Sequence, residues 1–203
     1  MFWPLIEQEI RVELANLGSH NPSGVYVIAN HDNLYLLDGV IFVHSGPYKG
    51  GIFHFQIHLP DDYGSVDSAA PRVKFKSHIP SHPRIDASGD LDLTLLLSKH
   101  QTGPSIDDPI DWLQSKKRIY IHTLCKFIKA SFKSDLLNAA PGSLYTIDRD
   151  RFETLAKADV EASIAALPES PSDLFQFNAL DEQQCKQLEE LLAAHENLTS
   201  MAP

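Results

Sequence analysis

The chain has 203 residues, of which 43% are hydrophobic and 22% are charged. These values are ordinary for a globular protein, and the length predicts one domain of about 150 residues plus a tail. The formal net charge of -10 argues against nucleic acid as a partner, because binding to phosphates needs a surface rich in lysine and arginine.

The first part of the chain predicts one helix followed by strands. Ile6, Ile10, Leu14 and Leu17 recur at helical spacing, so residues 5–17 are predicted to form an amphipathic helix. Four runs rich in β-forming residues come next, at residues 25–29, 35–44, 52–59 and 73–75. In the third run apolar and polar residues alternate, which is typical of a strand with one buried face.

The second part predicts a loop and then helices. Residues 94–111 read as a polar stretch that contains Gly103, Pro104, Pro109 and three aspartates, so we expect an irregular loop there. From Trp112 to Phe132 the pattern favours a buried helix, and a further helix is predicted at residues 148–167. On this second helix the apolar residues expected near one face are Phe152, Leu155, Val160 and Ile164. Strands in one block with helices outside it indicate an α+β domain, a four-stranded antiparallel meander with helices packed on one face.

A proline-rich linker separates the domain, residues 1–167, from a tail, residues 168–203. The tail predicts an amphipathic helix at residues 180–195. It also holds the candidates for partner binding, because such a helix can lie in a groove of another protein. The alternative is that the helix folds back on its own domain. The candidate partner-binding residues are Phe175, Phe177, Leu188, Leu191 and Leu192.

Cys125 and Cys185 are the only cysteines, which favours a reducing compartment. Cys125 lies in an apolar helical run and is predicted to be a core residue, the alternative being a relocated nucleophile.

No cluster of His, Cys and Asp has the spacing of a zinc site, so we expect neither a metal nor a cofactor. No apolar run approaches the roughly 18 residues that span a bilayer, so we expect a cytoplasmic protein without direct membrane insertion.

Residues 82–92 resemble the active-site segment of ubiquitin-conjugating enzymes. The run His-Pro-Arg-Ile-Asp-Ala-Ser-Gly-Asp-Leu-Asp is similar to that family's His-Pro-Asn-Ile, three residues, Gly, one residue, Ile, Cys. In this frame Asp92 stands at the position of the thioester-forming cysteine, and Arg84 at that of the asparagine that supports the oxyanion. The resemblance implies the ubiquitin-conjugating fold with no catalytic residue, because a carboxylate cannot carry ubiquitin as a thioester.

Further motifs of the same family follow in order along residues 5–166. They are Gly-Gly-Ile-Phe-His-Phe from residue 50, Pro-Arg-Val-Lys-Phe from residue 71, Trp112, Leu137-Asn138, and the stretch from Tyr145 to Phe152. Among inactive variants, the run from Asp38 to Val43 and the run from Gly89 to Asp92 most resemble the fused-toes/Akt-interacting branch.

That resemblance implies a function in binding. Members of the branch are adaptors that join Hook-type coiled-coil proteins and a larger scaffold in vesicle traffic linked to dynein. We therefore expect a pseudoenzyme in the cytoplasm that associates with vesicles or microtubules through its partners. Two alternatives stay open: a variant that binds ubiquitin without a covalent bond, and an atypical active conjugating enzyme that uses Cys125 or another group.

Overall fold

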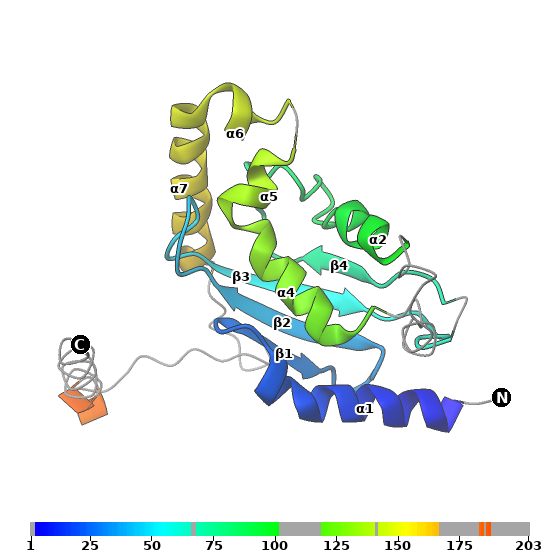
Figure 1. Ribbon diagram of the computed structural model, residues 1–203. Helices are drawn as coiled ribbons and strands as arrows, with labels where there is room; N and C mark the ends of the chain where they lie inside the picture. The colour runs from blue at the N-terminus through cyan, green and yellow to red at the C-terminus, as the bar shows by residue number, and fades with distance from the viewer. Residues whose placement is uncertain are drawn as a thin grey trace, which may run out of the picture. The chain divides into compact units, whose positions relative to one another are not determined.

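The computed structural model describes residues 3–65, 68–101, 119–140, 142–166, 183–184 and 186–187. The chain divides into two compact units, Met1–Leu167 and Pro168–Pro203. None of the helices in the described ranges has the length and apolar character that crossing a membrane needs. Figure 1 shows the elements of the first unit, which are α1 (Trp3–His20), β1 (Val25–Ala29), β2 (Leu36–Phe42), β3 (Ile52–His58), β4 (Arg72–Phe75), α2 (Thr94–Gln101), α4 (Ile121–Ser131), α5 (Ser134–Asn138), α6 (Leu144–Ile147) and α7 (Arg149–Ala165).

The four strands form one antiparallel meander in the order β1-β2-β3-β4. Between β2 and β3, Leu37 lies opposite Ile57 and Ile41 lies opposite Phe53. All four side chains are buried. Since successive side chains of a strand point to opposite sides of the sheet, this register gives the sheet one apolar face. The alternation predicted for residues 52–59 is therefore confirmed.

Gly39, in the middle of β2, makes room for an aromatic ring of the neighbouring strand. It lies opposite Phe55 of β3, and a Cβ atom built at position 39 would clash with the ring of Phe55. Phe55 itself is buried in the core. The glycine thus lets a large ring lie across β2, which a residue with a side chain would prevent.

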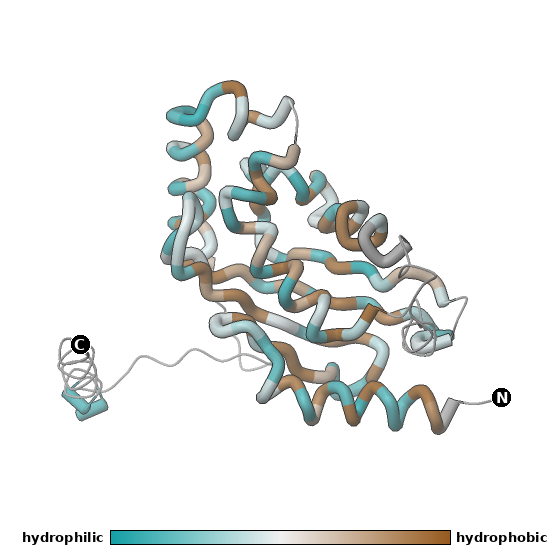
Figure 2. The backbone as a smooth tube through the Cα atoms, in the orientation of Figure 1, coloured by the Kyte–Doolittle hydropathy of each residue, from teal (hydrophilic) through white to brown (hydrophobic). Residues whose placement is uncertain are grey.

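Helices cover the apolar face of the sheet. Figure 1 shows α4 running across it, and α4 buries Leu124 and Ile128 there. Just beyond α4, Phe132 stacks on Phe53 of β3, with 5.2 Å between ring centroids. In Figure 2 hydrophobic stretches run along the strands beneath these helices. The predicted α+β architecture, a four-stranded meander with packed helices, is confirmed.

The opposite face of the sheet holds a buried carboxylate. Asp38 of β2 accepts hydrogen bonds from Asn30 at 3.0 Å, Gln56 at 2.9 Å and Lys76 at 3.0 Å. Burial alone would raise the pKa of Asp38, but these three donors lower it below its ordinary value. The sheet therefore buries an ionised group on its second face, where the donors compensate for the lost water.

The prediction of a loop at residues 94–111 is wrong for the first eight of these residues. Residues 94–101 form α2, and the remainder of that stretch lies outside the described residues. The backbone N–H of Thr94, in the first turn, donates to the carboxylate of Asp92 at 2.9 Å. Leu96 on the helix is buried in the core. A capping side chain and one anchored leucine thus give a helix where composition predicted a loop.

The helix predicted at residues 148–167 is present as α7, but the face predicted for it is partly wrong. Leu155 and Ile164 are 41% and 47% exposed, whereas Asp159 and Ser163 are buried. Asp159 accepts hydrogen bonds from the backbone N–H and the hydroxyl of Ser81. Ser163 accepts one from the N–H of Ile52 at 3.2 Å. Because these polar residues find partners in the core, they can replace apolar residues on the buried face.

This assignment predicts opposite effects on two sides of α7. Asp159→Ala leaves both donors of Ser81 without an acceptor, so it should lower the free energy of unfolding by about 2 kcal/mol. Leu155→Ala, on the exposed side, should change it by less than about 0.5 kcal/mol. Urea denaturation of both variants measures the two losses of unfolding free energy. A larger loss for Leu155→Ala than for Asp159→Ala would contradict this assignment and favour the buried apolar face that the periodicity predicted.

Candidate functional site

The segment from His82 to Asp92 folds back on itself beside β4. Ile85 pairs with Leu91 as an isolated antiparallel bridge, and the N–H of Asp92 donates to the carbonyl of Arg84 at 2.8 Å. The two predicted site residues, eight positions apart in sequence, are therefore neighbours in space. Nη1 of Arg84 donates to Oδ2 of Asp92 at 3.0 Å.

Arg84 is held from three directions. Besides its bond to Asp92, its Nε donates to the carbonyl of Leu136 at 3.1 Å, and its Nη2 to the carbonyl of Ala139 at 3.0 Å. Both carbonyls lie at the carboxyl end of α5, where a helix leaves such groups without partners inside the helix. The side chain of Arg84 is only 5% exposed. Arg84 thus ties the segment 82–92 to the turn after α5 and places its charge where the helix dipole favours a cation.

Asp92 is nearly half exposed and caps α2. The pKa of Asp92 lies below its ordinary value, first because the carboxylate is hydrogen-bonded to Thr94 and also because Arg84 is positively charged. Burial has a smaller effect in the opposite direction. The carboxylate is therefore ionised near neutral pH and acts as a hydrogen-bond acceptor. It serves two neighbours at once and has no chemistry that forms a thioester.

His82 supports this segment from inside the core. It is buried, its Nε2 donates to the carbonyl of Ser131 at 3.1 Å, and its Nδ1 accepts from the N–H of Arg84 at 3.2 Å. These partners select the neutral tautomer with the proton on Nε2. Burial lowers the pKa of His82 to about 4. A protonated ring would place a second hydrogen against the N–H of Arg84 and lose this contact.

The pKa of His82 predicts acid sensitivity. Because the folded-state pKa, about 4, is lower than the ordinary 6.5, the contribution of His82 is present above pH 6.5 and is lost as the pH falls toward 4. Between pH 7.5 and pH 5 the wild type should lose about 2 kcal/mol of unfolding free energy through this residue. Urea denaturation at both pH values measures this loss in the wild type and in His82→Gln, whose side chain at position 82 does not titrate. Equal losses in the two proteins would contradict it.

The described part of the chain offers no accessible thiol. Cys125 lies fully buried in α4, and burial raises the pKa of its thiol to about 12. A thiol with that pKa is protonated near neutral pH and is a poor nucleophile. The prediction that Cys125 is a core residue is confirmed. Cys185 lies outside the described residues.

The structure does not test the other predicted site residues. Trp112 and the five partner-binding candidates of the tail, Phe175, Phe177, Leu188, Leu191 and Leu192, lie outside the described residues. Among the residues that the structure describes, no group of three or more His, Cys, Asp or Glu side chains is placed to hold a metal ion.

The partners of Arg84 were not predicted from the sequence. They are main-chain carbonyls, and a carbonyl has no signature in an amino-acid sequence. The cap on α2 did have a signal, because an aspartate two residues before Thr94 is a common start of a helix. Reading residues 92–97 as a helix start would have placed Asp92 in its structural role.

Comparison with known families identifies the fold. The family model described as ubiquitin-conjugating enzyme matches residues 9–160. The chain belongs to the ubiquitin-conjugating enzyme family. The motifs that suggested this resemblance therefore reflect membership, and the four-stranded meander with its helices is the domain of that family.

Similarity to individual proteins indicates the branch of the family to which the chain is related. The protein crossbronx homolog of Culex quinquefasciatus is 41% identical over 100 residues, which are 49% of this chain and 42% of that protein. A protein crossbronx-like of Drosophila grimshawi is 36% identical over 110 residues, which are 54% of this chain and 44% of that protein. The AKT-interacting protein of Homo sapiens is 26% identical over 170 residues, which are 82% of this chain and 53% of that protein. The chain spans about half the length of the curated relatives it matches. The predicted place near the fused-toes/Akt-interacting branch is confirmed.

Proposed function

We propose that this chain is a catalytically inactive ubiquitin-conjugating-enzyme variant that acts as a protein-protein adaptor. The observation that supports this most strongly is the ion pair between Arg84 and Asp92. On the motif of residues 82–92, we assign Asp92 to the position of the cysteine and Arg84 to that of the asparagine.

Both halves of the catalytic chemistry are missing under this assignment. Conjugation needs a thiolate that attacks and later leaves, and Asp92 offers an ionised carboxylate that is already bonded to Arg84 and Thr94. It also needs a hydrogen-bond donor aimed at the developing oxyanion. The three nitrogen atoms of Arg84 each donate to an acceptor within the protein. The site is therefore built to hold the loop together, and binding is the function left to the domain.

The partners we propose follow from the branch. The name of the human relative, AKT-interacting protein, is that of a protein that binds another protein. By the resemblance to that branch, we propose a Hook-type coiled-coil protein and an associated scaffold as partners. The chain would then be cytoplasmic and reach vesicles or microtubules through this complex.

Co-elution of purified proteins tests the adaptor proposal. The full chain, mixed with a purified Hook-type coiled-coil protein, should elute from size-exclusion chromatography as a complex of higher mass than either component. Separate elution of two folded proteins, with folding checked by circular dichroism, would contradict it.

The tail is the binding segment that we propose. A variant with Phe175→Ser, Phe177→Ser, Leu188→Ser, Leu191→Ser and Leu192→Ser should fail to co-elute while the domain stays folded. Co-elution equal to that of the wild type would exclude the tail.

A second candidate, non-covalent ubiquitin binding, has one observation in its favour. Tyr26 and Ile28 of β1 are 56% and 37% exposed, and both point away from the packed helices. Exposed apolar side chains on a sheet are a common feature of binding surfaces. Titration of labelled ubiquitin, followed by NMR, should show saturable shifts that Tyr26→Ser removes. Absence of shifts would exclude this candidate.

A further inference from the structure

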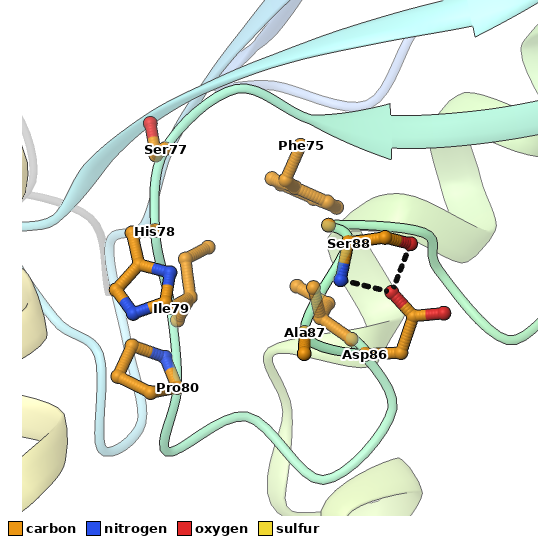
Figure 3. A pocket seen from close by; sticks show the side chains of 10 residues that line it. Phe75, Ser77, His78, Ile79, Pro80, Asp86, Ala87 and Ser88 are labelled. Carbon is orange, nitrogen blue, oxygen red and sulfur yellow. Dashed lines mark hydrogen bonds between the residues drawn. The ribbon is translucent and has the colours of Figure 1, made fainter.

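A small slot lies beside the segment that leads to Asp92. Its two walls are the loop of residues 77–80 after β4 and the turn of residues 85–89, and its volume is about 230 Å³ (Figure 3). Phe75, Ile79 and Ile85 line it and are less than 9% exposed, so they belong to the core as well. The slot is therefore an opening through which the apolar core of the domain reaches the surface.

The size of the slot limits what it can hold. Sites for small molecules and cofactors usually have volumes of about 300 to 1,000 Å³. A hollow of 230 Å³ is smaller than this range and suits a single aliphatic side chain. Its lining is mostly apolar at the base, and Pro80 and Ala87 stand at the exposed rim.

The rim carries a fixed negative charge. Oδ1 of Asp86 accepts hydrogen bonds from the N–H of Ser88 at 2.8 Å, from its hydroxyl at 2.6 Å, and from the N–H of Asp90 at 3.0 Å. Figure 3 shows the two bonds to Ser88. These bonds, first of all the one from the Ser88 hydroxyl, lower the pKa of Asp86. The carboxylate is therefore ionised and held in one orientation.

The neighbouring carboxylate differs, because it already has a cationic partner. Asp90 forms an ion pair with Arg72 at 3.0 Å, whereas Asp86 forms none with any residue in the described ranges. The chain as a whole has a formal net charge of -10. Charge complementarity therefore favours a basic ligand at this rim.

We propose that this slot docks a linear, basic segment of a partner protein. One leucine-sized side chain of that segment fills the slot, and an adjacent arginine or lysine pairs with Asp86. The proposal rests on the adaptor function and names the chemistry of one partner contact. Because Ile85 pairs with Leu91, the docked segment lies against the loop that in active members of the family leads to the nucleophile.

Two short peptides test the proposal by NMR on the isotope-labelled full chain. The probe is acetyl-Arg-Leu-Arg-amide, and its charge-reversed control is acetyl-Glu-Leu-Glu-amide. One buried side chain and one exposed ion pair give weak binding, so we expect a Kd of about 1 mM for the basic peptide. The resonances of Ile79, Ile85, Ala87 and Ser88 should shift and saturate with the basic peptide and stay in place with the acidic one.

Two variants separate the slot from the charge. Ala87→Leu places a larger side chain at the rim and should abolish the shifts. Asp86→Asn keeps an acceptor for Ser88 but removes the charge, and should weaken binding about threefold. Equal shifts with both peptides, shifts confined to other residues, or full binding by Ala87→Leu would each overturn the proposal. If the basic peptide fails to bind while the full chain still co-elutes with the coiled-coil protein, the slot is excluded and the adaptor function stands.

Discussion

Replacing Arg84 by alanine should lower the free energy of unfolding by about 3 kcal/mol. The variant leaves the carbonyls of Leu136 and Ala139 without their donor and removes a buried side chain between two segments of the chain. Most of the loss should come from these buried contacts, because Asp92 is 46% exposed and water weakens its ion pair. Urea denaturation at neutral pH measures the change.

Three further variants show whether geometry or charge is responsible. Arg84→Lys keeps the charge but cannot reach three acceptors at once, so its loss should be intermediate. Asp92→Asn keeps an acceptor for Thr94 and should cost less than about 1 kcal/mol. Arg72→Ala removes an exposed partner of Asp90 and should cost about 0.5 kcal/mol or less. A loss for Arg84→Ala no larger than that for Arg72→Ala would contradict the structural role of Arg84.

Phe132→Ala should have the largest effect on stability, a loss of about 3 to 5 kcal/mol. The ring of Phe132 stacks on Phe53, and its centroid lies 5.0 Å from that of His82 and 5.4 Å from that of Tyr48. Removing the ring of Phe132 leaves a cavity between the sheet and His82, the residue that supports the segment 82–92. The free energy of unfolding from urea denaturation measures this loss.

Ile147→Ala is the matched control for the core variant. Ile147 is 73% exposed, so its truncation removes little buried surface and should change the unfolding free energy by less than about 0.5 kcal/mol. Similar losses for both variants would mean that Phe132 does not occupy the centre of the core.

The sequence predicted the sheet well because each strand carries its own pattern. In β3, buried aromatic and aliphatic residues alternate with polar ones, and the period of two is visible without any knowledge of the fold. The helices were harder. In α7, Asp159 and Ser163 are buried because Ser81 and Ile52 supply partners from distant parts of the chain, and hydropathy cannot show such partners.

The candidate site was predicted only in part. The motif of residues 82–92 pointed to Arg84 and Asp92, but not to the bond between them or to their structural use. The acceptors at Leu136 and Ala139 lie about fifty positions away and are main-chain atoms. Only the folded chain brings them together, and this explains how a charged arginine side chain can be buried at position 84.

A charging assay tests the central claim, the absence of conjugating activity, most directly. The purified full chain is incubated with ubiquitin-activating enzyme, ATP and ubiquitin, beside an active conjugating enzyme that becomes fully charged under the same conditions. We predict that no ubiquitin adduct sensitive to reductant forms on this chain. A reductant-sensitive adduct that appears only with ATP would contradict the account, and its loss in Cys125→Ser or Cys185→Ser would identify the sulfur responsible.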